Sequence, residues 1–358
     1  MRGKMGDLTG ASALAFSLAA LNLATAQNFS YGADNFYRSD NVTLWPITFR
    51  TIYHTTVAGN LFLPDFLDYS ANNSAIVVSH PMGAVQEQSA NLYATKMAEQ
   101  GFVTVSIDIP SYGGSEGQPT NSVLPDMYSE AVSATVDYLG LQSYVDRRRI
   151  GAIGICGSGG FVVSAAKIDP RISAVATASM YDMGAVNRDG LMHSQSVQER
   201  KEVIAQAAEQ RWVEAAGAET SYQLGTPLRL TNTSTAIDRE FYDYYRTSRG
   251  EVTPPGSAPN ITTGRSVTSN AKFMNFYPFD DIETISPRPM LLITGDIAHS
   301  REFSADAYAR AAEPKEIMWI PGAGHVDLYD RVDLIPFAKL FDFFQTNLAG
   351  NSTSLPLK

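Results

Sequence analysis

The single cysteine of the chain, Cys156, lies where a nucleophile would be placed. It sits in the stretch Gly-Ile-Cys-Gly-Ser-Gly-Gly (154–160), between an apolar run at 150–155 that is typical of a buried strand and a helical pattern at 161–168. A strand that runs through Gly-x-Cys-x-small into a helix is the pattern of a nucleophile elbow, because the sharp turn leaves room only for small neighbours. The N-terminus of the helix would lower the pKa of the thiol. The pattern therefore predicts nucleophilic chemistry at Cys156.

Two other readings of this stretch remain open. Ser158 would be the nucleophile if the strand extended through Gly157, but the apolar run stops at Ile155, which favours Cys156. Alternatively, Cys156 is an inert small core residue, which is the commoner fate of a lone cysteine. A histidine near the end of the chain favours the nucleophile.

That histidine is His325, at the end of the glycine-rich segment 321–325. It follows a strand pattern at 317–320 and precedes a helical pattern at 334–348. A histidine in such a loop can act as the general base for a cysteine, and flanking glycines allow the ring to approach closely. The remaining histidines are less well placed for this role: His54, His80, His193 and His299.

The third member of a triad should orient the base and stabilise its cationic form. If the chain order is nucleophile, acid, base, the acid should follow the strand pattern at 290–294, which places Asp296 in that role. Asp327 and Asp330 are closer to His325 in sequence, but we expect them to cap the helix that follows.

Two backbone N–H groups should stabilise the oxyanion. The natural first donor is the N–H of Gly157, directly after the nucleophile. The second should come from the loop His-Pro-Met-Gly-Ala (80–84), where the N–H of Met82 or Gly83 could face the same point. A plain turn is the alternative for this loop, since Pro and Gly mark turns in any case.

Strand and helix patterns alternate along most of the chain, which predicts an α/β fold with a mostly parallel sheet covered on both faces. The first two strands should form an antiparallel pair, with Gly59 and Asn60 near the turn or in a bulge. The strands are expected at 44–51, 57–63, 75–79, 102–109, 150–155, 172–179, 290–294 and 317–320. The helices are expected at 92–100, 127–139, 161–168, 303–312 and 334–348.

One region interrupts the alternation. It contains a charged helical stretch at 196–215 and then a segment rich in Pro, Gly, Ser, Thr and Asn. We expect a helical cap over the carboxyl edge of the sheet. The predicted organisation is a signal peptide (1–26), a first core part (27–184), the cap (185–285) and a second core part (286–358).

Composition limits the possible partners. The chain has 358 residues, 44% of them hydrophobic and 18% charged, with a formal net charge of −10. This composition excludes disorder over most of the chain. The negative charge argues against nucleic acid and anionic membranes and favours a neutral or weakly charged small-molecule substrate. Oligomeric state is not indicated.

The N-terminus has the features of a secretory leader. Arg2 and Lys4 precede an apolar stretch at 11–24, and Ala-Thr-Ala (24–26) offers a cleavage site. The stretch is too short for stable membrane insertion. Six N-glycosylation sequons fit a secreted protein, and the alternative is an uncleaved N-terminus on a cytoplasmic enzyme. The sequons are at Asn28, Asn41, Asn72, Asn232, Asn260 and Asn351.

With these residues identified, the chain resembles the α/β-hydrolases, and within them the dienelactone-hydrolase and YcjY-like branch that includes fungal polyketide transferases and hydrolases of secondary-metabolite clusters. Five stretches in order carry the resemblance and cover most of the chain outside the leader and the cap: 79–117, 136–161 (VDYLGLQSYVDRRRIGAIGICGSGGF), 169–184, 298–308 (AHSREFSADAY) and 313–330 (EPKEIMWIPGAGHVDLYD).

The resemblance implies a Cys or Ser nucleophile at position 156, a base at His325 and backbone oxyanion donors at Met82 and Gly157. It also implies acyl chemistry on esters, lactones or thioesters, without a metal or organic cofactor. The chain departs from the family pattern in having Ser rather than Gly at 158, and the family does not fix its acid at the spacing of Asp296.

The leading hypothesis is therefore an acyl hydrolase or acyltransferase that uses a Cys-His-Asp triad on a polyketide-type small molecule, in fungal secondary-metabolite biosynthesis. A non-hydrolytic cyclase or isomerase on the same fold is a second hypothesis. A secreted, catalytically inactive binding protein is a third, and a secreted peptidase is a fourth.

Overall fold

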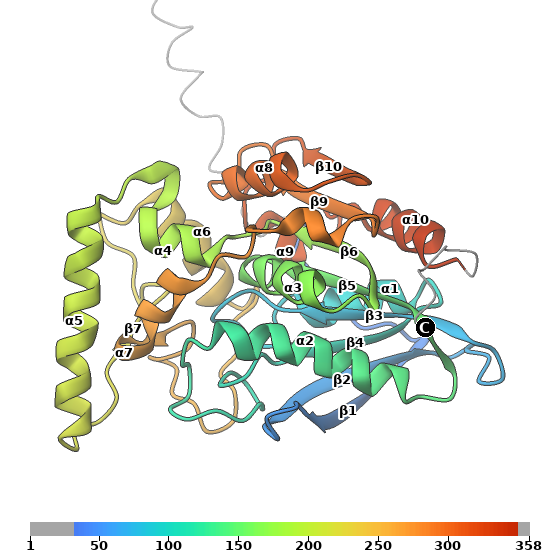
Figure 1. Ribbon diagram of the computed structural model, residues 1–358, viewed down its shortest axis with the longest axis horizontal. Helices are drawn as coiled ribbons and strands as arrows, with labels where there is room; N and C mark the ends of the chain where they lie inside the picture. Colours follow the sequence, from blue (N-terminus) through green and yellow to red (C-terminus); the bar gives the residue numbers. More distant parts are fainter. Residues whose placement is uncertain (1–31, 350–358) are drawn as a thin grey trace, which may run out of the picture.

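An eight-stranded sheet runs through the centre of the molecule (Figure 1). The computed structural model describes residues 32–349, so the expected leader at 1–26 and the sequons at Asn28 and Asn351 lie outside the described residues. The strand order is β1-β2-β4-β3-β5-β6-β9-β10. The strands are β1 (Val42–Arg50), β2 (Thr56–Pro64), β3 (Asn73–Ser79), β4 (Val103–Ile107), β5 (Val145–Ile155), β6 (Ile172–Ala178), β9 (Met290–Gly295) and β10 (Lys315–Ile320).

Six of these strands are parallel, from β4 to β10, and β1 and β2 form an antiparallel edge. The central strands β3, β4, β6 and β9 are almost completely buried because helices cover both of their faces. The parallel register places the carboxyl ends of β3 and β5 beside each other, with Ser79 opposite Gly154. The loops that follow these two strands therefore meet at one edge of the sheet.

Helices pack on both faces of the sheet. On one face, α1 lies against β3 and β4, and α10 contacts α1 and β6; on the other, α2 and α3 lie against β5 and against each other, and α8 packs on β9 and β10. The covering on both faces that the alternation predicts is confirmed. These helices are α1 (Ala90–Ala98), α2 (Pro125–Gly140), α3 (Gly157–Ile168), α8 (Arg301–Arg310) and α10 (Phe337–Asn347), and a short α9 (Asp327–Asp330) precedes α10.

The prediction for the opening hairpin was wrong in one respect. Gly59 and Asn60 lie in the middle of β2, opposite Ile47 and Pro46, and the turn is at 51–55. Gly59 is required there for another reason: a Cβ atom would lie 2.6 Å from the carbonyl oxygen of Ser106 on β4. Close approach of two strands, rather than a turn, explains this glycine.

The segment between β6 and β9 forms the cap. It holds α4 (Met183–Asp189), α5 (Val197–Ala215), α6 (Ala236–Tyr245), α7 (Val267–Asn270) and a two-stranded sheet of β7 (Tyr222–Gln223) and β8 (Arg265–Ser266), with the 3-10 helices η1 (Leu191–His193), η2 (Ala271–Asn275) and η3 (Ile282–Ile285). In Figure 1 α5 stands at the left-hand edge, away from the sheet.

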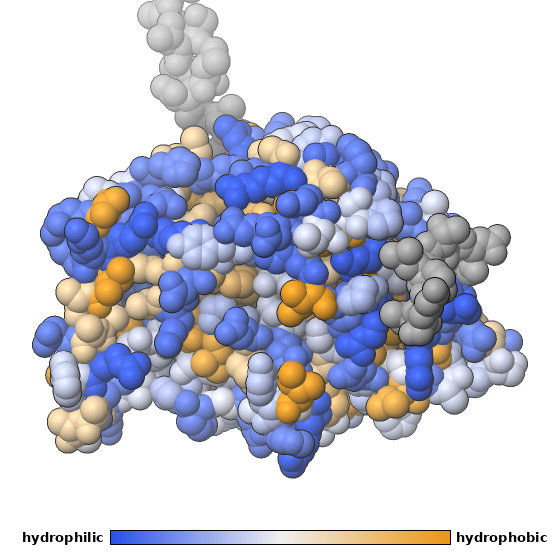
Figure 2. Space-filling view, viewed as in Figure 1, coloured by the Kyte–Doolittle hydropathy of each residue, from blue (hydrophilic) through white to orange (hydrophobic). Residues whose placement is uncertain are grey.

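Helix α5 begins with a capping box, in which Ser196 and Glu199 each bond the backbone of the other. Of its side chains only Ala207 is buried. The helix therefore combines local capping with half-exposed contacts to α4, α7 and η2. The face of the molecule in Figure 2 is largely hydrophilic, with apolar side chains interspersed.

Within residues 32–349, none of the helices combines the length and the apolar character that crossing a membrane requires.

Candidate active site

Cys156 is at a strained turn between β5 and α3. Its backbone has φ 54° and ψ −122°, a region that residues with a side chain rarely adopt. Glycines on either side make the turn possible: a Cβ atom on Gly154 would lie 2.3 Å from the carbonyl oxygen of Ser158, and one on Gly157 would lie 2.6 Å from the Met82 side chain. This is the geometry of a nucleophile elbow, and it places the sulfur at the N-terminus of α3.

Ser158, the alternative nucleophile, is committed to the core. Its side chain is fully buried, and its hydroxyl bonds the Ser79 hydroxyl (2.9 Å) and the carbonyl oxygen of His80. It joins the carboxyl end of β3 to the start of α3 and does not line the cavity at Cys156. The geometry thus favours Cys156 over Ser158.

The surroundings of the thiol act on its pKa in opposite directions. Burial raises the pKa of Cys156 to about 11, and the Tyr329 hydroxyl and the backbone N–H groups of Gly157 and Met82 act against this increase. These two N–H groups are the pair that the sequence indicates for the oxyanion. One comes from the loop after β3 and the other from the first turn of α3, and both act on the same sulfur.

His325 is completely buried beside this turn. Its Nδ1 lies 2.6 Å from the Ser300 hydroxyl, and its Nε2 lies 2.9 Å from the Tyr329 hydroxyl. Burial, with a smaller contribution from the nearby His299, holds the pKa of His325 well below its ordinary value. The imidazole is therefore neutral at pH 7 and can accept a proton.

Tyr329 connects the histidine to the cysteine. Burial raises the pKa of its hydroxyl, so the hydroxyl keeps its proton. In the tautomer in which Nε2 accepts a hydrogen bond from this hydroxyl, Nδ1 carries the proton and donates to the Ser300 hydroxyl. The same hydroxyl interacts with the Cys156 sulfur. Tyr329 therefore acts on both groups, through a hydrogen bond to the imidazole and through the pKa of the thiol.

The structure does not bring Asp296 to His325. One carboxylate oxygen of Asp296 accepts the N–H of Gly322 at 2.7 Å, and no hydrogen bond joins Asp296 to the imidazole among residues 32–349. The carboxylate stabilises the loop that carries the histidine, and the ring nitrogen that an acid would orient is occupied by Ser300.

The two other acids near His325 also have structural partners. Asp327 accepts the N–H of Gly324 at 2.7 Å, and Asp330 pairs with the buried Arg249 of the cap at 2.7 Å. The expectation that they cap the C-terminal helix was wrong, because α10 begins only at Phe337.

A carboxylate of the cap lies in the next layer around the imidazole. Glu240, on α6, bonds Nδ1 of His299 at 3.2 Å and accepts the N–H of Val326 at 2.7 Å. The ring of His299 lies 4.7 Å from that of His325. Glu240 thus connects the cap both to the loop of His325 and to its neighbouring ring.

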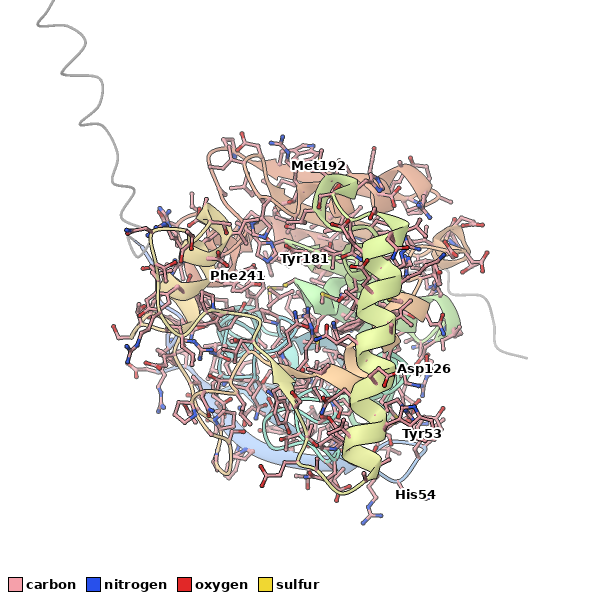
Figure 3. All side chains as sticks on the ribbon, turned by 90° about the vertical axis from the view of Figure 1, so that its left-hand side faces the viewer. Tyr53, His54, Asp126, Tyr181, Met192 and Phe241 are labelled. Atoms are coloured by element: carbon pink, nitrogen blue, oxygen red, sulfur yellow. The ribbon has the colours of Figure 1, made fainter. Side chains whose placement is uncertain are left out.

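A cavity of about 200 Å³ opens over the sulfur. In Figure 3 Tyr181 and Phe241 lie near each other in the interior, and both rings pack edge-on against His325, with centroids 5.0 and 5.6 Å from it. The lining residues come from the elbow, the loop after β3 and the cap: Met82, Gly83, Tyr112, Cys156, Tyr181, Met183, Val186, Asn187, Gly225, Thr226, Phe241, Tyr245, Thr263, Gly264, Arg265 and Tyr329.

The sequence alone did not indicate Ser300, Tyr329 or Glu240 as residues of the site. A signal existed for Tyr329, which lies four residues after His325 and so shares one face of a helical turn with it.

The four sequon asparagines within the described residues are exposed: Asn41, Asn72, Asn232 and Asn260. The described residues hold no cluster of three or more His, Cys, Asp or Glu suited to a metal ion.

Comparisons with known proteins agree with this architecture. The profile of the alpha/beta hydrolase family matches residues 76–335. Uncharacterized protein PA2218 of Pseudomonas aeruginosa is 44% identical over 304 residues, which are 84% of this chain and 80% of that protein. Its crystal structure superposes with a TM-score of 0.82, covering 90% of this chain and 98% of the other.

Other relatives are more distant in sequence. Uncharacterized protein YcjY of Escherichia coli is 33% identical and covers 75% of this chain and 87% of its own. Thiohydrolase aneE of Aspergillus aculeatus is 24% identical, covering 80% of this chain and 88% of its own, and fungal polyketide transferases match at 22 and 23%.

Proposed function

Because the chain belongs to the alpha/beta hydrolase family, we propose that it is an acyl hydrolase or acyltransferase in which Cys156 attacks the carbonyl of an ester, lactone or thioester. The observation that carries the proposal is the strained turn at Cys156, with backbone N–H groups and a buried imidazole connected to its sulfur. An inert core cysteine requires none of these features.

The first step is attack by the thiol as its proton leaves. As the carbon–sulfur bond forms, the thiol proton passes to the Tyr329 hydroxyl, and that hydroxyl gives its own proton to Nε2 of His325. The raised pKa of the thiol, about 11, and the lowered pKa of the imidazole mean that both groups are neutral before attack. Proton transfer therefore accompanies bond formation rather than preceding it.

The developing oxyanion is stabilised by the N–H groups of Met82 and Gly157. When the tetrahedral intermediate collapses, the imidazolium returns its proton to the leaving alcohol or thiol. A water molecule or an acceptor hydroxyl then attacks the acyl-cysteine, and His325 takes the proton of that nucleophile. The carbon–sulfur bond breaks as the proton returns to the sulfur, which regenerates the thiol. Thioesters suit this site, since attack by the Cys156 sulfur converts the substrate thioester into an acyl-enzyme thioester and releases the substrate's thiol.

The relatives support a polyketide-type acyl group as the substrate class. The thiohydrolase and the polyketide transferases cover about four fifths of this chain, although at low identity. We extend their chemistry to this chain as acyl transfer to or from sulfur or oxygen, and assign it to secondary-metabolite biosynthesis on the same basis.

Turnover by position-156 variants tests this function. Activated esters and thioesters of short acids are offered to the purified full chain, to Cys156→Ala and to Cys156→Ser. We expect Cys156→Ala to lose at least about a thousandfold in kcat, in the range of removing a catalytic nucleophile, and Cys156→Ser to retain partial activity. Ser158→Ala is the matched control and should fold and turn over. Full turnover by Cys156→Ala would remove the proposal.

One observation favours a second candidate. The partner of Nδ1 on His325 is a neutral hydroxyl, Ser300, so no carboxylate directly stabilises an imidazolium. A cyclase or isomerase that only moves protons on a bound substrate needs this less than an acyl-enzyme mechanism does. Such an enzyme would give a product of unchanged mass, and blocking the thiol would not affect its rate unless the reagent also obstructed the cavity.

We further propose that the chain enters the secretory route. The exposed positions of Asn41, Asn72, Asn232 and Asn260 are compatible with glycans on a folded surface.

A further inference from the structure

Arg265 is the one charged residue among those lining the cavity over Cys156. It lies on β8 of the cap, where it pairs with Gln223 of β7. A cation on the wall of an otherwise neutral and aromatic cavity needs an explanation, because an unpaired charge away from water is unfavourable.

The guanidinium of Arg265 has no partner of its own. Among residues 32–349 it forms no ion pair and no side-chain hydrogen bond, and its Nε is buried without an acceptor. Burial lowers the pKa of Arg265, and the titratable side chains that act against this are those of Tyr112 and Tyr128, which burial keeps protonated. The Tyr128 hydroxyl itself donates a hydrogen bond to the carbonyl oxygen of Ser122.

The other buried and half-buried arginines of the cap show the contrast. Each has a defined structural partner: Arg188 with the carbonyl oxygen of Phe276, Arg200 with Asp189, Arg246 with Thr262, and Arg249 with Asp330 and Asp243. The Nε of Arg246 is also buried without an acceptor, but its two Nη atoms are bonded, whereas no atom of the Arg265 guanidinium has a hydrogen-bond or ion-pair partner among residues 32–349. A structural role in the cap therefore does not account for Arg265.

We propose that Arg265 binds an anionic group of the substrate, and that this group is a carboxylate at the far end of the acyl chain. This inference rests on the proposed function and deepens it: the substrate is a monoester or monothioester of a dicarboxylic acid. The planar fork of the guanidinium matches a carboxylate with two parallel hydrogen bonds. The substrate thereby supplies the counter-ion that the protein lacks.

This arrangement gives the cap a role in specificity. Cys156, on the sheet side of the cavity, attacks the carbonyl, and Arg265, on the cap side, binds the anion. A single acyl group therefore extends across the cavity from one residue to the other. A neutral acyl group of the same length would leave the guanidinium unpaired, and the enzyme should discriminate against it.

Matched esters test the proposal. The para-nitrophenyl half-esters of succinic, glutaric and adipic acids are compared with their methyl esters, which have similar length and no charge. Wild-type protein should prefer one of the half-esters in kcat/KM by about tenfold or more. Arg265→Gln should lower kcat/KM for that half-ester by about 10- to 100-fold, mainly through KM, and change the methyl ester by no more than about threefold.

Control variants separate the subsite from general charge and folding effects. Arg229→Gln removes an exposed cation from the same cap segment and should leave both rates unchanged. Arg265→Lys should retain part of the preference, because it keeps the charge and loses the fork. If Arg265→Gln does not fold, the wild-type preference and the Arg265→Lys variant decide the matter.

The source of the anion and the failure modes are also distinguishable. Free glutarate should inhibit the wild-type protein more strongly than inorganic phosphate does; the reverse order would assign the subsite to a phosphate of the leaving group and overturn the carboxylate. Equal kcat/KM values for half-esters and methyl esters, with Cys156→Ala inactive, would contradict the anion subsite and leave the proposed function intact. Turnover by Cys156→Ala would sink the proposed function, and glutarate binding measured by calorimetry would still report on Arg265.

Discussion

The sheet side and the cap side of the active site are built in different ways. On the sheet side, Cys156, Met82 and Gly157 are held by backbone geometry at the ends of β3 and β5. On the cap side, Glu240 and Arg265 contribute through side chains alone. The first arrangement suits steps common to all acyl transfers, and the second suits recognition of a particular substrate. The family therefore indicates the type of reaction, whereas the side chains of the cap determine which substrate binds.

The largest mutational effect should come from the base on the sheet side. His325→Ala should lower kcat by about 10³- to 10⁴-fold, since the imidazole is the final proton acceptor in the proposed path from Cys156 through Tyr329. Stopped-flow or steady-state hydrolysis of an activated ester measures this. The control is His54→Ala, which lies in an exposed loop far from Tyr181 in Figure 3 and should retain full activity. A drop of less than tenfold would remove His325 from the mechanism.

The alkylation rate of the thiol should show the next largest effect. With a pKa of about 11, Cys156 is almost entirely protonated at pH 7, so its reaction with iodoacetamide should rise about tenfold per pH unit, or about 10³-fold between pH 7 and 10. The chain contains one cysteine, so the adduct is unambiguous. A rate that levels off near neutral pH would indicate a preformed thiolate and contradict the neutral pair.

Removal of one oxygen atom tests the connection between the two groups. Tyr329→Phe should lower kcat by about 10- to 100-fold while KM stays nearly constant, because only the proton path is interrupted. A purely structural role would instead reduce the melting temperature and affect KM and kcat together. Tyr53→Phe, at an exposed tyrosine, is the matched control.

Variants of two carboxylates, one on each side of the site, compare the contributions of the sheet side and the cap side to kcat. Asp296→Asn on the sheet side should change kcat by no more than about threefold, because its oxygen accepts a backbone N–H and the amide oxygen can do the same. Glu240→Gln on the cap side should lower kcat by about three- to tenfold through its contacts with His299 and Val326. If Asp296 is the acid of the triad, as the chain order predicts, its variant should instead lose about 10⁴-fold.

The sequence predicted the sheet side better than the cap side, for physical reasons. The elbow requires glycines at fixed offsets from the nucleophile, and this requirement is local to 154–160. The Met82 loop could be inferred because parallel topology places the ends of β3 and β5 together. Strand and helix periodicity is local as well.

The cap contacts have no such local signature. Glu240 reaches the loop of His325 across 86 residues of sequence, and nothing near it in the chain indicates that contact. Asp296 illustrates the same limit from the other side, since its position after β9 is right for an acid and yet its side chain turns to Gly322. Side-chain direction at the end of a strand depends on the packing around it.

The smallest effect is expected from surface glycans. In protein from a eukaryotic secretory host, Asn41 and Asn72 on the core and Asn232 and Asn260 on the cap should carry N-glycans that an endoglycosidase removes. Because all four side chains are exposed, kcat/KM should remain within about twofold after their removal. Mass spectrometry of the intact protein detects the shift, and an unmodified chain from such a host would contradict entry into the secretory route.

The most direct test of the account is the identity of the residue that becomes acylated. The protein is mixed with a slowly hydrolysed ester or thioester, quenched in acid, digested and analysed by mass spectrometry. We predict an acyl adduct on Cys156, absent from Cys156→Ala and lost when excess nucleophile is added before the quench. Turnover without any adduct on Cys156, or an adduct on Ser158 in the active wild-type protein, would contradict the account.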